Sequence, residues 1–316
     1  MKPIAIAILT LAASIANGAK ADVPVFALGE YSRSTDSADF TARTVAAGAG
    51  FYTSAADNFI DKIAYRHRQL NYEGPGFATE GSADSLIASK VFGAIRADGE
   101  ITRARVDSFG RRTLGAFQLA GQMPGAVNLE ARFEKDLVES APSLKQGITY
   151  SAYTLAADKE ITPRFVLAGV AGRLDFSDNN QRDLFRLKAN YVVVEDMGLS
   201  VYAKARHYSD SQPGGLLYFS PDSYEDYLGG IRIRRRVGEL RGMVSAYFEA
   251  GRQKANGVSS PARGWQVRLE SFPDKPWHYD VAIGLQTSAD VGASQPSVHG
   301  DYQYKYLRAS VVYPFF

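Results

Sequence analysis

The sequence predicts an all-β protein, a transmembrane antiparallel β-barrel of 16 strands, with 14 strands as the alternative. About 16 or 17 strand-length runs alternate apolar with polar residues. Because side chains alternate between the two faces of a strand, such runs place one apolar and one polar face on a sheet. A secretory leader precedes the runs, and the chain ends on aromatic residues. An exported chain of this kind is either soluble or a barrel, and single-chain bacterial barrels have even strand numbers.

The N-terminus predicts a cleaved signal peptide over residues 1–21. Lys2 supplies the positive start, residues 4–15 form a short apolar run, and residues 19–21 read Ala-Lys-Ala, a small-x-small cleavage site. The alternative is an N-terminal membrane anchor, but the run is too short to cross a bilayer of ~30 Å as a helix. Residues 22–316 are therefore expected to form the barrel.

Composition excludes several classes of function. Lys and Arg number 36 and Asp and Glu 34, so the chain lacks the basic excess typical of nucleic-acid binding. There is no Cys, and the four His residues show no paired ligand spacing, so no metal and no cofactor are expected. Stability without disulfides then has to come from a large closed sheet.

Polar residues recur on one face of successive runs in the second half of the chain. Leu187 and Ala189, for example, alternate with Lys188 and Asn190. In a membrane barrel the charged face lines the lumen. The candidates for the pore lining are Arg132, Glu134, Arg186, Lys188, Tyr202, Lys204, Arg206, Arg232, Arg234, Arg268 and Glu270.

Turn chemistry separates the runs. We expect hairpin turns at residues 97–99, 123–125, 158–160 and 196–198, and long loops at residues 209–223 and 289–298. Residues 137–144 predict a longer loop or a short helical turn. A soluble β-sandwich also alternates, but short turns and long loops together favour the barrel.

The last strand, residues 302–316, is expected to close the barrel through Tyr313, Phe315 and Phe316. It resembles the C-terminal strand of Gram-negative outer-membrane β-barrel proteins, which usually end on Phe. One departure is that Phe315, rather than Phe316, falls on the apolar face. Pro314 fits only a strand end or edge, because it donates no ladder hydrogen bond.

Residues 131–155, 172–191 and 216–235 resemble the C-terminal barrels of exopolysaccharide-secretion porins, which export cellulose or poly-N-acetylglucosamine. The most characteristic pieces read FSDNNQR at residues 176–182 and YFSP at residues 218–221. The resemblance implies a Gram-negative outer-membrane location and a polysaccharide cargo. It also implies outer-membrane lipids, the barrel-assembly machinery, an inner-membrane synthase and a periplasmic repeat scaffold as partners. The tetratricopeptide repeats of the long family members are absent here.

Six residues of these motifs are loop or turn candidates: Asp175, Asp178, Asn180, Arg182, Tyr218 and Phe219. Asp178 and Asn180 are turn formers, since their side chains bond nearby backbone. We expect Arg182 to pair with Asp175 across the turn. The segment at residues 218–221 either folds into the lumen as a gate or caps its own loop.

The leading hypothesis is a porin that secretes an exopolysaccharide. A polymer moving through a pore needs many weak contacts, which aromatic and charged lining residues supply. The alternative for the same residues is a salt-bridged interior that sets charge selectivity in a general or solute-specific diffusion porin. A lipid-modifying barrel enzyme is the third possibility, and we expect no enzyme because no Ser and His pair forms a recognisable catalytic pattern.

Overall fold

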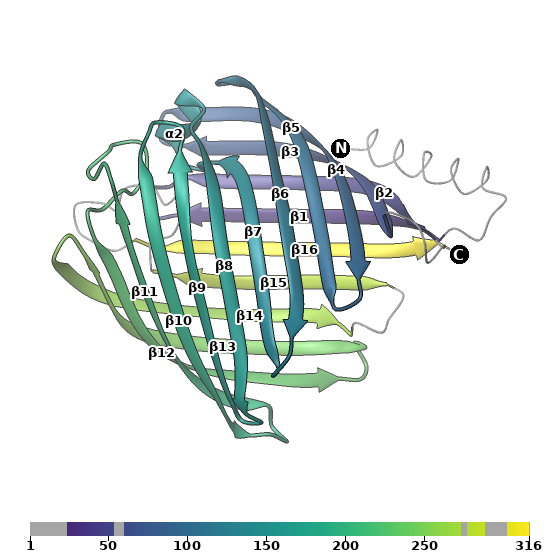
Figure 1. Cartoon of the computed structure of the whole chain (residues 1–316). Coiled ribbons are helices and arrows are strands. Elements are labelled where there is room, and N and C mark those ends of the chain that lie inside the picture. The colour runs from purple at the N-terminus through teal and green to yellow at the C-terminus, as the bar shows by residue number, and fades with distance from the viewer. Residues whose placement is uncertain (1–23, 54–59, 273–276, 288–301, 316) are drawn as a thin grey trace.

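The computed structural model describes residues 24–53, 60–272, 277–287 and 302–315, which form one closed antiparallel barrel (Figure 1). It has 16 strands, each hydrogen-bonded to its neighbours in the chain. This confirms the predicted fold class and strand number. The expected signal peptide, the loop at residues 289–298 and Phe316 lie outside the described residues.

The strands follow one another around the barrel in chain order. Their bounds are β1 Val25–Asp36, β2 Thr41–Tyr52, β3 Lys62–Gly74, β4 Phe77–Phe92, β5 Ile95–Val106, β6 Gly110–Met123, β7 Val127–Leu137, β8 Thr149–Thr162, β9 Phe165–Phe176, β10 Gln181–Val194, β11 Leu199–Asp210, β12 Tyr224–Val237, β13 Gly242–Ala255, β14 Val258–Ser271, β15 His278–Gln286 and β16 Tyr304–Phe315. One short helix, α2 (Ala141–Gln146), interrupts the connection between β7 and β8.

The last strand closes the barrel on the first. β16 pairs with β1 from Val25↔Phe315 to Asp36↔Tyr304, and this pairing removes both sheet edges. The Tyr313 and Phe315 rings meet edge to face on the same side of the strand, with centroids 5.4 Å apart. The predicted closing strand is thus confirmed for its described residues.

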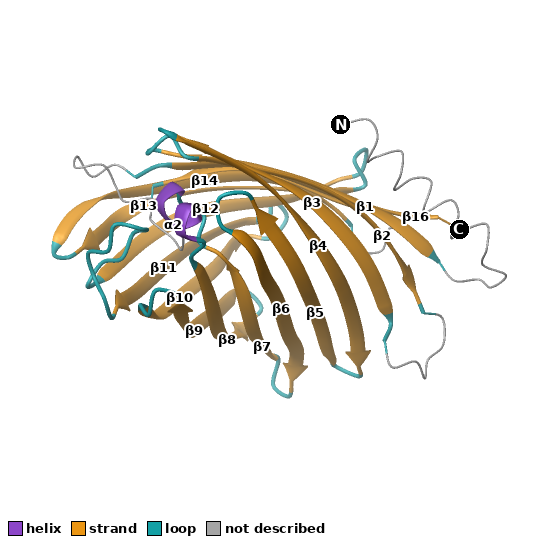
Figure 2. Cartoon of the chain, turned by 90° about the horizontal axis from the view of Figure 1, so that it is seen from above, coloured by secondary structure: helices purple, strands orange, loops and turns teal. Residues whose placement is uncertain are grey.

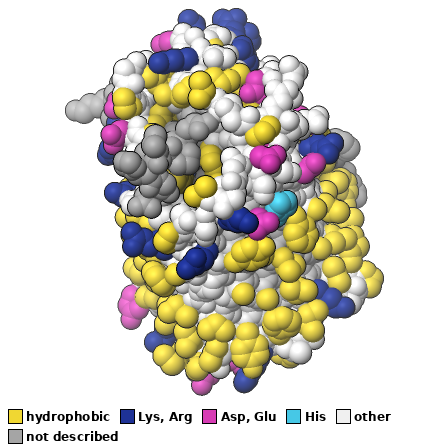
Figure 3. Space-filling view, turned by 90° about the vertical axis from the view of Figure 1, so that its left-hand side faces the viewer, with side chains coloured by type: hydrophobic (Ala, Val, Ile, Leu, Met, Phe, Trp, Pro, Cys, Tyr) yellow, Lys and Arg dark blue, Asp and Glu magenta, His cyan; other side chains and the backbone are white. Residues whose placement is uncertain are grey.

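The outer wall is an apolar belt. Exposed Phe185 and Tyr227 lie toward one end of the strands, and exposed Tyr191 and Tyr313 lie toward the other. Figure 3 shows hydrophobic side chains covering the lower part of one face, with charged side chains gathered above them. Aromatic rings at both edges of an apolar band are typical of outer-membrane barrels. Among the described residues, no helix is long and apolar enough to cross a membrane.

The connections differ between the two ends of the barrel. The end at which β1 begins and β16 ends has the tight turns between β4 and β5, β10 and β11, and β12 and β13. The opposite end carries the long loop between β11 and β12 and the segment with α2 (Figure 2). The helical turn expected near residues 137–144 is therefore confirmed. In barrels of this class the long loops face outside the cell, so we call this end the extracellular mouth.

Two predicted turns were misplaced. Asp98 and Gly99 lie inside β5, and the chain reverses earlier, at Gly93, whose φ is +59°. The Asp98 carboxylate accepts hydrogen bonds from Ser89 Oγ at 2.6 Å and from Arg96 Nε at 2.7 Å, so it is satisfied within the sheet. Residues 158–160 likewise continue β8, whereas the turns expected at residues 123–125 and 196–198 are present.

Gly48 and Gly50 of β2 allow a close approach of neighbouring backbone, as their position in a small-residue run predicts. A Cβ atom at Gly48 would collide with the Tyr65 carbonyl oxygen, and one at Gly50 with the Ile63 carbonyl oxygen. Both acceptors lie on β3, so the packing of β2 against β3 depends on these glycines.

We expect Gly48→Ala to destabilise the folded barrel by about 1–3 kcal/mol, because the added methyl group must displace backbone. Heat-modified mobility on gels and urea unfolding in detergent measure this. Gly99→Ala is the matched control, since its Cβ would lie 3.8 Å from the nearest atom, on Phe117. Equal midpoints for the two variants would contradict the close-approach account.

Candidate functional site

The strand register places all the predicted pore-lining residues on the inner face of the wall. Register pairs such as Arg186↔Arg206 and Lys188↔Lys204 join lumen-facing partners on adjacent strands. Arg132, Glu134 and Arg186 line a cavity of about 480 Å³ inside the barrel. Lys188, Lys204 and Arg206 line a second cavity of about 350 Å³. Their role in transport stays a prediction.

Most lumen charges are paired. Lys204 Nζ lies 2.7 Å from Glu249, whose other oxygen accepts a hydrogen bond from Tyr202 at 2.8 Å. Arg206 pairs with Asp226 at 2.6 Å. Partially buried charges need such partners, because desolvation of an isolated ion is costly. Sequence reasoning missed these acidic partners, although alternation along β12 and β13 would have placed them on the lumen face.

A second set of ion pairs joins β12, β14 and β15 on the lumen wall. Arg234 lies 2.9 Å from Glu270, and Arg268 bonds both Glu270, at 3.2 Å, and Asp280. On the other side of the lumen Arg132 pairs with Glu134. The interior is therefore a largely ion-paired polar wall surrounding open cavities.

The two characteristic motifs meet at the extracellular mouth. The Tyr218 ring stacks on Phe176 with centroids 4.5 Å apart, and Tyr218 Oη donates to Asp178 at 3.1 Å. Asn180 Nδ2 donates to Tyr218 Oη and to Asp210, both at 3.0 Å. We call Phe176, Asp178, Asn180, Arg182, Asp210 and Tyr218 the mouth cluster.

Arg182 is a fully buried cation of the mouth cluster. Its Nε lies 3.1 Å from both oxygens of Asp210, and its Nη2 donates to the Phe219 carbonyl oxygen at 2.5 Å. The side chains of Arg182 and Asp210 are 2 % and 0 % exposed. The guanidinium also lies 4.4 Å from the Tyr208 ring centroid. The buried ion pair thus joins the start of β10 to the end of β11, and the Arg182 hydrogen bond to Phe219 fixes the β11–β12 loop to them.

The expected pair of Arg182 with Asp175 does not form. Asp175 registers opposite Gln181, one residue away from Arg182, and therefore lies on the other face of the hairpin. The partner is Asp210, which registers opposite Arg182 on β11. The pairing of β10 with β11, rather than proximity across the turn, selects the partner.

The β11–β12 loop folds inward. Phe219 packs with Tyr208 and Tyr224, and Tyr218 packs with Leu174 and Val138 in the interior of the mouth. On the other half of the mouth, Leu144 of α2 packs into a cluster with Tyr72. Both alternatives for residues 218–221 are present: Tyr218 and Phe219 pack inward, while Ser220 accepts hydrogen bonds from the backbone of Gly214 and Gly215 in its own loop. A role as a gate stays a prediction.

The two inward segments are joined to each other. Ser140, the N-cap of α2, and Ser143 both donate their hydroxyl groups to the Leu217 carbonyl oxygen, at 2.5 and 2.9 Å. α2 ends at Gly147, whose φ of +66° suits the left-handed cap. Outward movement of either segment, α2 or the β11–β12 loop, would therefore break these two hydrogen bonds.

Glu139, at the mouth, has a carboxyl group with an unusually high pKa. Enclosure by the barrel, and then the negative charge of Asp136, raises the pKa of Glu139 to about 7. Tyr72 Oη lies 3.2 Å away, and Arg68 and Arg308 are the nearby cations. The Glu139 side chain is exposed to the lumen, so water screens its charge and its ionisation has little effect on the stability of the fold. Ionisation of Glu139 instead changes the net charge of the mouth.

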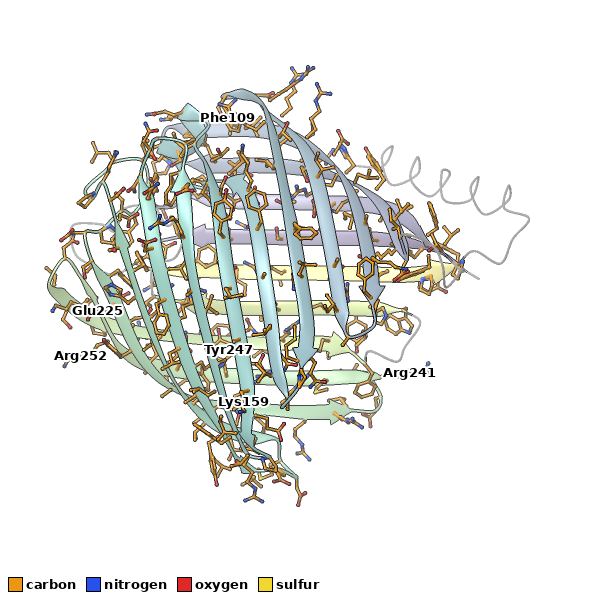
Figure 4. All side chains as sticks on the ribbon, viewed as in Figure 1. Phe109, Lys159, Glu225, Arg241, Tyr247 and Arg252 are labelled. Carbon is orange, nitrogen blue, oxygen red and sulfur yellow. The ribbon has the colours of Figure 1, made fainter. Side chains whose placement is uncertain are left out.

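Figure 4 shows how the side chains are distributed over the barrel: Arg241 is labelled near the terminal end, and Glu225 and Arg252 near the mouth. Among the described residues no group of three His, Asp or Glu residues could hold a metal ion. Fold and lumen together define an outer-membrane β-barrel with a polar interior that contains cavities.

Comparisons agree with this class. No family model and no curated protein matches the chain. A structure described as a bacterial polysaccharide outer membrane secretin is similar, with a TM-score of 0.66, 10% identity, and coverage of 93% of this chain and 98% of that chain. CdiB from Acinetobacter baumannii is similar with a TM-score of 0.50 and 10% identity, and the match covers 92% of this chain and 60% of that chain. OccD1 (OprD) gives a TM-score of 0.49 at 7% identity, and the match covers 93% of this chain and 95% of that chain.

At these identities the likeness shows the fold. That fold is a closed barrel of the outer-membrane kind. The resemblance to secretion porins that the sequence suggested is therefore supported at the level of barrel architecture.

We expect Arg182→Gln to destabilise the mouth by about 3–5 kcal/mol, because it leaves the Asp210 carboxylate buried without its cation. Protease cleavage within residues 211–223 and urea unfolding in detergent measure the loss. Arg173→Gln removes an exposed pair with Asp183 on the same hairpin and is expected to change little. Similar behaviour of both variants would show that the buried pair does not hold the loop.

We expect the cation preference of the pore to rise as pH increases from about 6 to about 8, because Glu139 becomes negative as pH passes its raised pKa. Reversal potentials in planar bilayers under a salt gradient test this. Glu139→Gln should flatten the pH dependence, whereas Glu239→Gln, on an exposed turn, serves as a control for loss of a carboxylate. A wild-type pH profile in Glu139→Gln would refute the assignment.

Proposed function

We propose that this barrel passes an exopolysaccharide outward across the outer membrane. The observation that carries the proposal is the lumen wall, on which tyrosines alternate in space with charged and amide groups. Tyr202 and Tyr247 meet edge to face with centroids 6.5 Å apart, and Lys188 Nζ lies 4.4 Å from the Tyr202 centroid. Tyr306 Oη donates to Gln266 at 2.6 Å.

Such a wall suits a moving sugar chain. An aromatic ring packs against the apolar face of a sugar, while neighbouring polar groups exchange hydrogen bonds with its hydroxyls. Contacts must be numerous and weak, since tight binding at one place would stop transport. Because many lumen charges already have protein partners, each can bond a passing hydroxyl without binding the polymer strongly.

Two further lines support a polysaccharide cargo. The sequence motifs that resemble secretion porins form one structural unit at the mouth, and the fold is similar to that of a polysaccharide secretin. We propose the same partners as the resemblance implies: an inner-membrane synthase and a periplasmic repeat scaffold on the inner side. A cleaved signal peptide and the barrel-assembly machinery would bring the chain to outer-membrane lipids.

A diffusion porin is the second candidate. The ion-paired wall around Arg268 and Glu270 could set charge selectivity for small solutes without any secretion partner. The two candidates differ in what a null strain loses: a polymer outside the cell, or uptake of a small solute.

Deletion of the gene in its native host is expected to abolish secreted polysaccharide and to cause accumulation in the periplasm. Complementation with a Tyr202→Ala, Tyr247→Ala variant should restore less polymer than wild type. Tyr227→Ala, on the outer wall and 60% exposed, is the matched control and should restore secretion fully. Unchanged polysaccharide in the deletion strain would overturn the proposed function.

A further inference from the structure

A basic strip runs across three neighbouring strands of the lumen wall. It consists of Arg186 and Lys188 on β10, Lys204 and Arg206 on β11, and Arg232 on β12. Arg186 registers directly opposite Arg206, and Lys188 directly opposite Lys204. Like charges directly opposite one another on one face destabilise a sheet. Two such pairs in succession therefore need a compensating negative charge.

The described residues supply that charge for two of the cations. Glu249 neutralises Lys204, and Asp226 neutralises Arg206. Within the described residues, Lys188 and Arg232 form no ion pair. Lys188 instead lies over the Tyr202 ring.

Arg232 lies two residues from Arg234 on the same strand face, and the carboxylate of Glu270 is taken up by Arg234 and Arg268. Two cations of the strip thus stay half-buried in the lumen without an acidic partner in the described chain.

The cavity beside the strip is positively charged. Its charged lining residues are Arg186, Lys188, Lys204, Arg206 and Asp226. Glu249 and Asp226 pair with Lys204 and Arg206, so Lys188 is the cation of this lining that has no ion pair among the described residues. Val170, Arg186 and Gln286 line both this cavity and the larger one, so the two are adjacent in the lumen. Four residues of the strip, Arg186, Lys188, Lys204 and Arg206, therefore border lumen space.

The acidic residues of the larger cavity do not cancel this charge. They lie on other elements: Asp36 on β1, Glu130 and Glu134 on β7, and Glu139 beyond it. Glu134 forms an ion pair with Arg132 and accepts a hydrogen bond from the Tyr150 hydroxyl at 2.8 Å. The field across the lumen thus favours negative groups on the β10–β12 side and disfavours them beside β7.

We propose that the basic strip is a binding track for an anionic polysaccharide, one whose sugars carry carboxylate groups. This inference rests on the proposed function and specifies its substrate class. The carboxylates would pair in passing with Lys188 and Arg232 and relieve the like-charge pairs. Because each ion pair is exposed to lumen water, each contact stays weak enough to be exchanged.

The test uses the full-length purified protein in planar bilayers. Current block is titrated with an oligogalacturonate, a neutral maltooligosaccharide and a cationic glucosamine oligomer of equal length. The oligogalacturonate is expected to block at the lowest concentration, and its block should weaken as salt is raised. A Lys188→Gln, Arg232→Gln variant should weaken that block by about tenfold or more.

Lys305→Gln removes one lysine from an outward-facing position on β16 and should leave the block unchanged. If the double variant does not insert, Lys188→Gln alone is measured, and the oligosaccharide preference of the wild type still decides. Equal block by the neutral oligomer, or stronger block by the cationic one, overturns the inference. Anion-selective block by a barrel whose deletion leaves polysaccharide secretion intact would keep the anion track and overturn only the export function.

Discussion

The closure of β1 on β16 is the constraint on which the rest of the structure depends. In a bilayer each backbone N–H and C=O group needs a partner, and only a sheet without edges supplies one at every position. The register from Val25↔Phe315 to Asp36↔Tyr304 achieves this. Closure then divides the side chains into an outer set facing lipid and an inner set enclosed in the lumen. The apolar belt, the ion-paired wall and the inward loops are consequences of that division.

Enclosure explains the chemistry of the interior. Sixteen strands surround more space than side chains alone fill, so the wall residues face both protein and water. Charges such as Glu249 find partners across strands, whereas Lys188 lines open cavity and has no ion-pair partner among the described residues. The mouth is narrowed by two segments whose mutual contact, at the Leu217 carbonyl, makes them a single structural unit. In the function we propose, selectivity would depend on both the strip and the mouth.

Sequence alone predicted what depends on alternation. The period of two fixes the face of Arg186 and Lys204 whatever the exact strand ends, and it also predicted the strand number. It could not predict pairings between distant segments. Asp98-Gly99 reads as a turn, but the partner strands extend past it and the reversal occurs at Gly93. Arg182 pairs with Asp210, 28 residues away, because the β10–β11 register brings them together. Neither residues 176–182 nor residues 218–221 carry a sequence pattern that predicts their contact with each other.

The central claim is that a polysaccharide chain passes through the lumen of this barrel. Its most direct measurement is transit of a fluorescent polyuronate through the purified protein reconstituted in liposomes, compared with protein-free liposomes and with a neutral polysaccharide of equal size. The account predicts that the polyuronate crosses only when the barrel is present, and faster than the neutral chain. Passage of ions and small solutes with no transit of either polymer would contradict it.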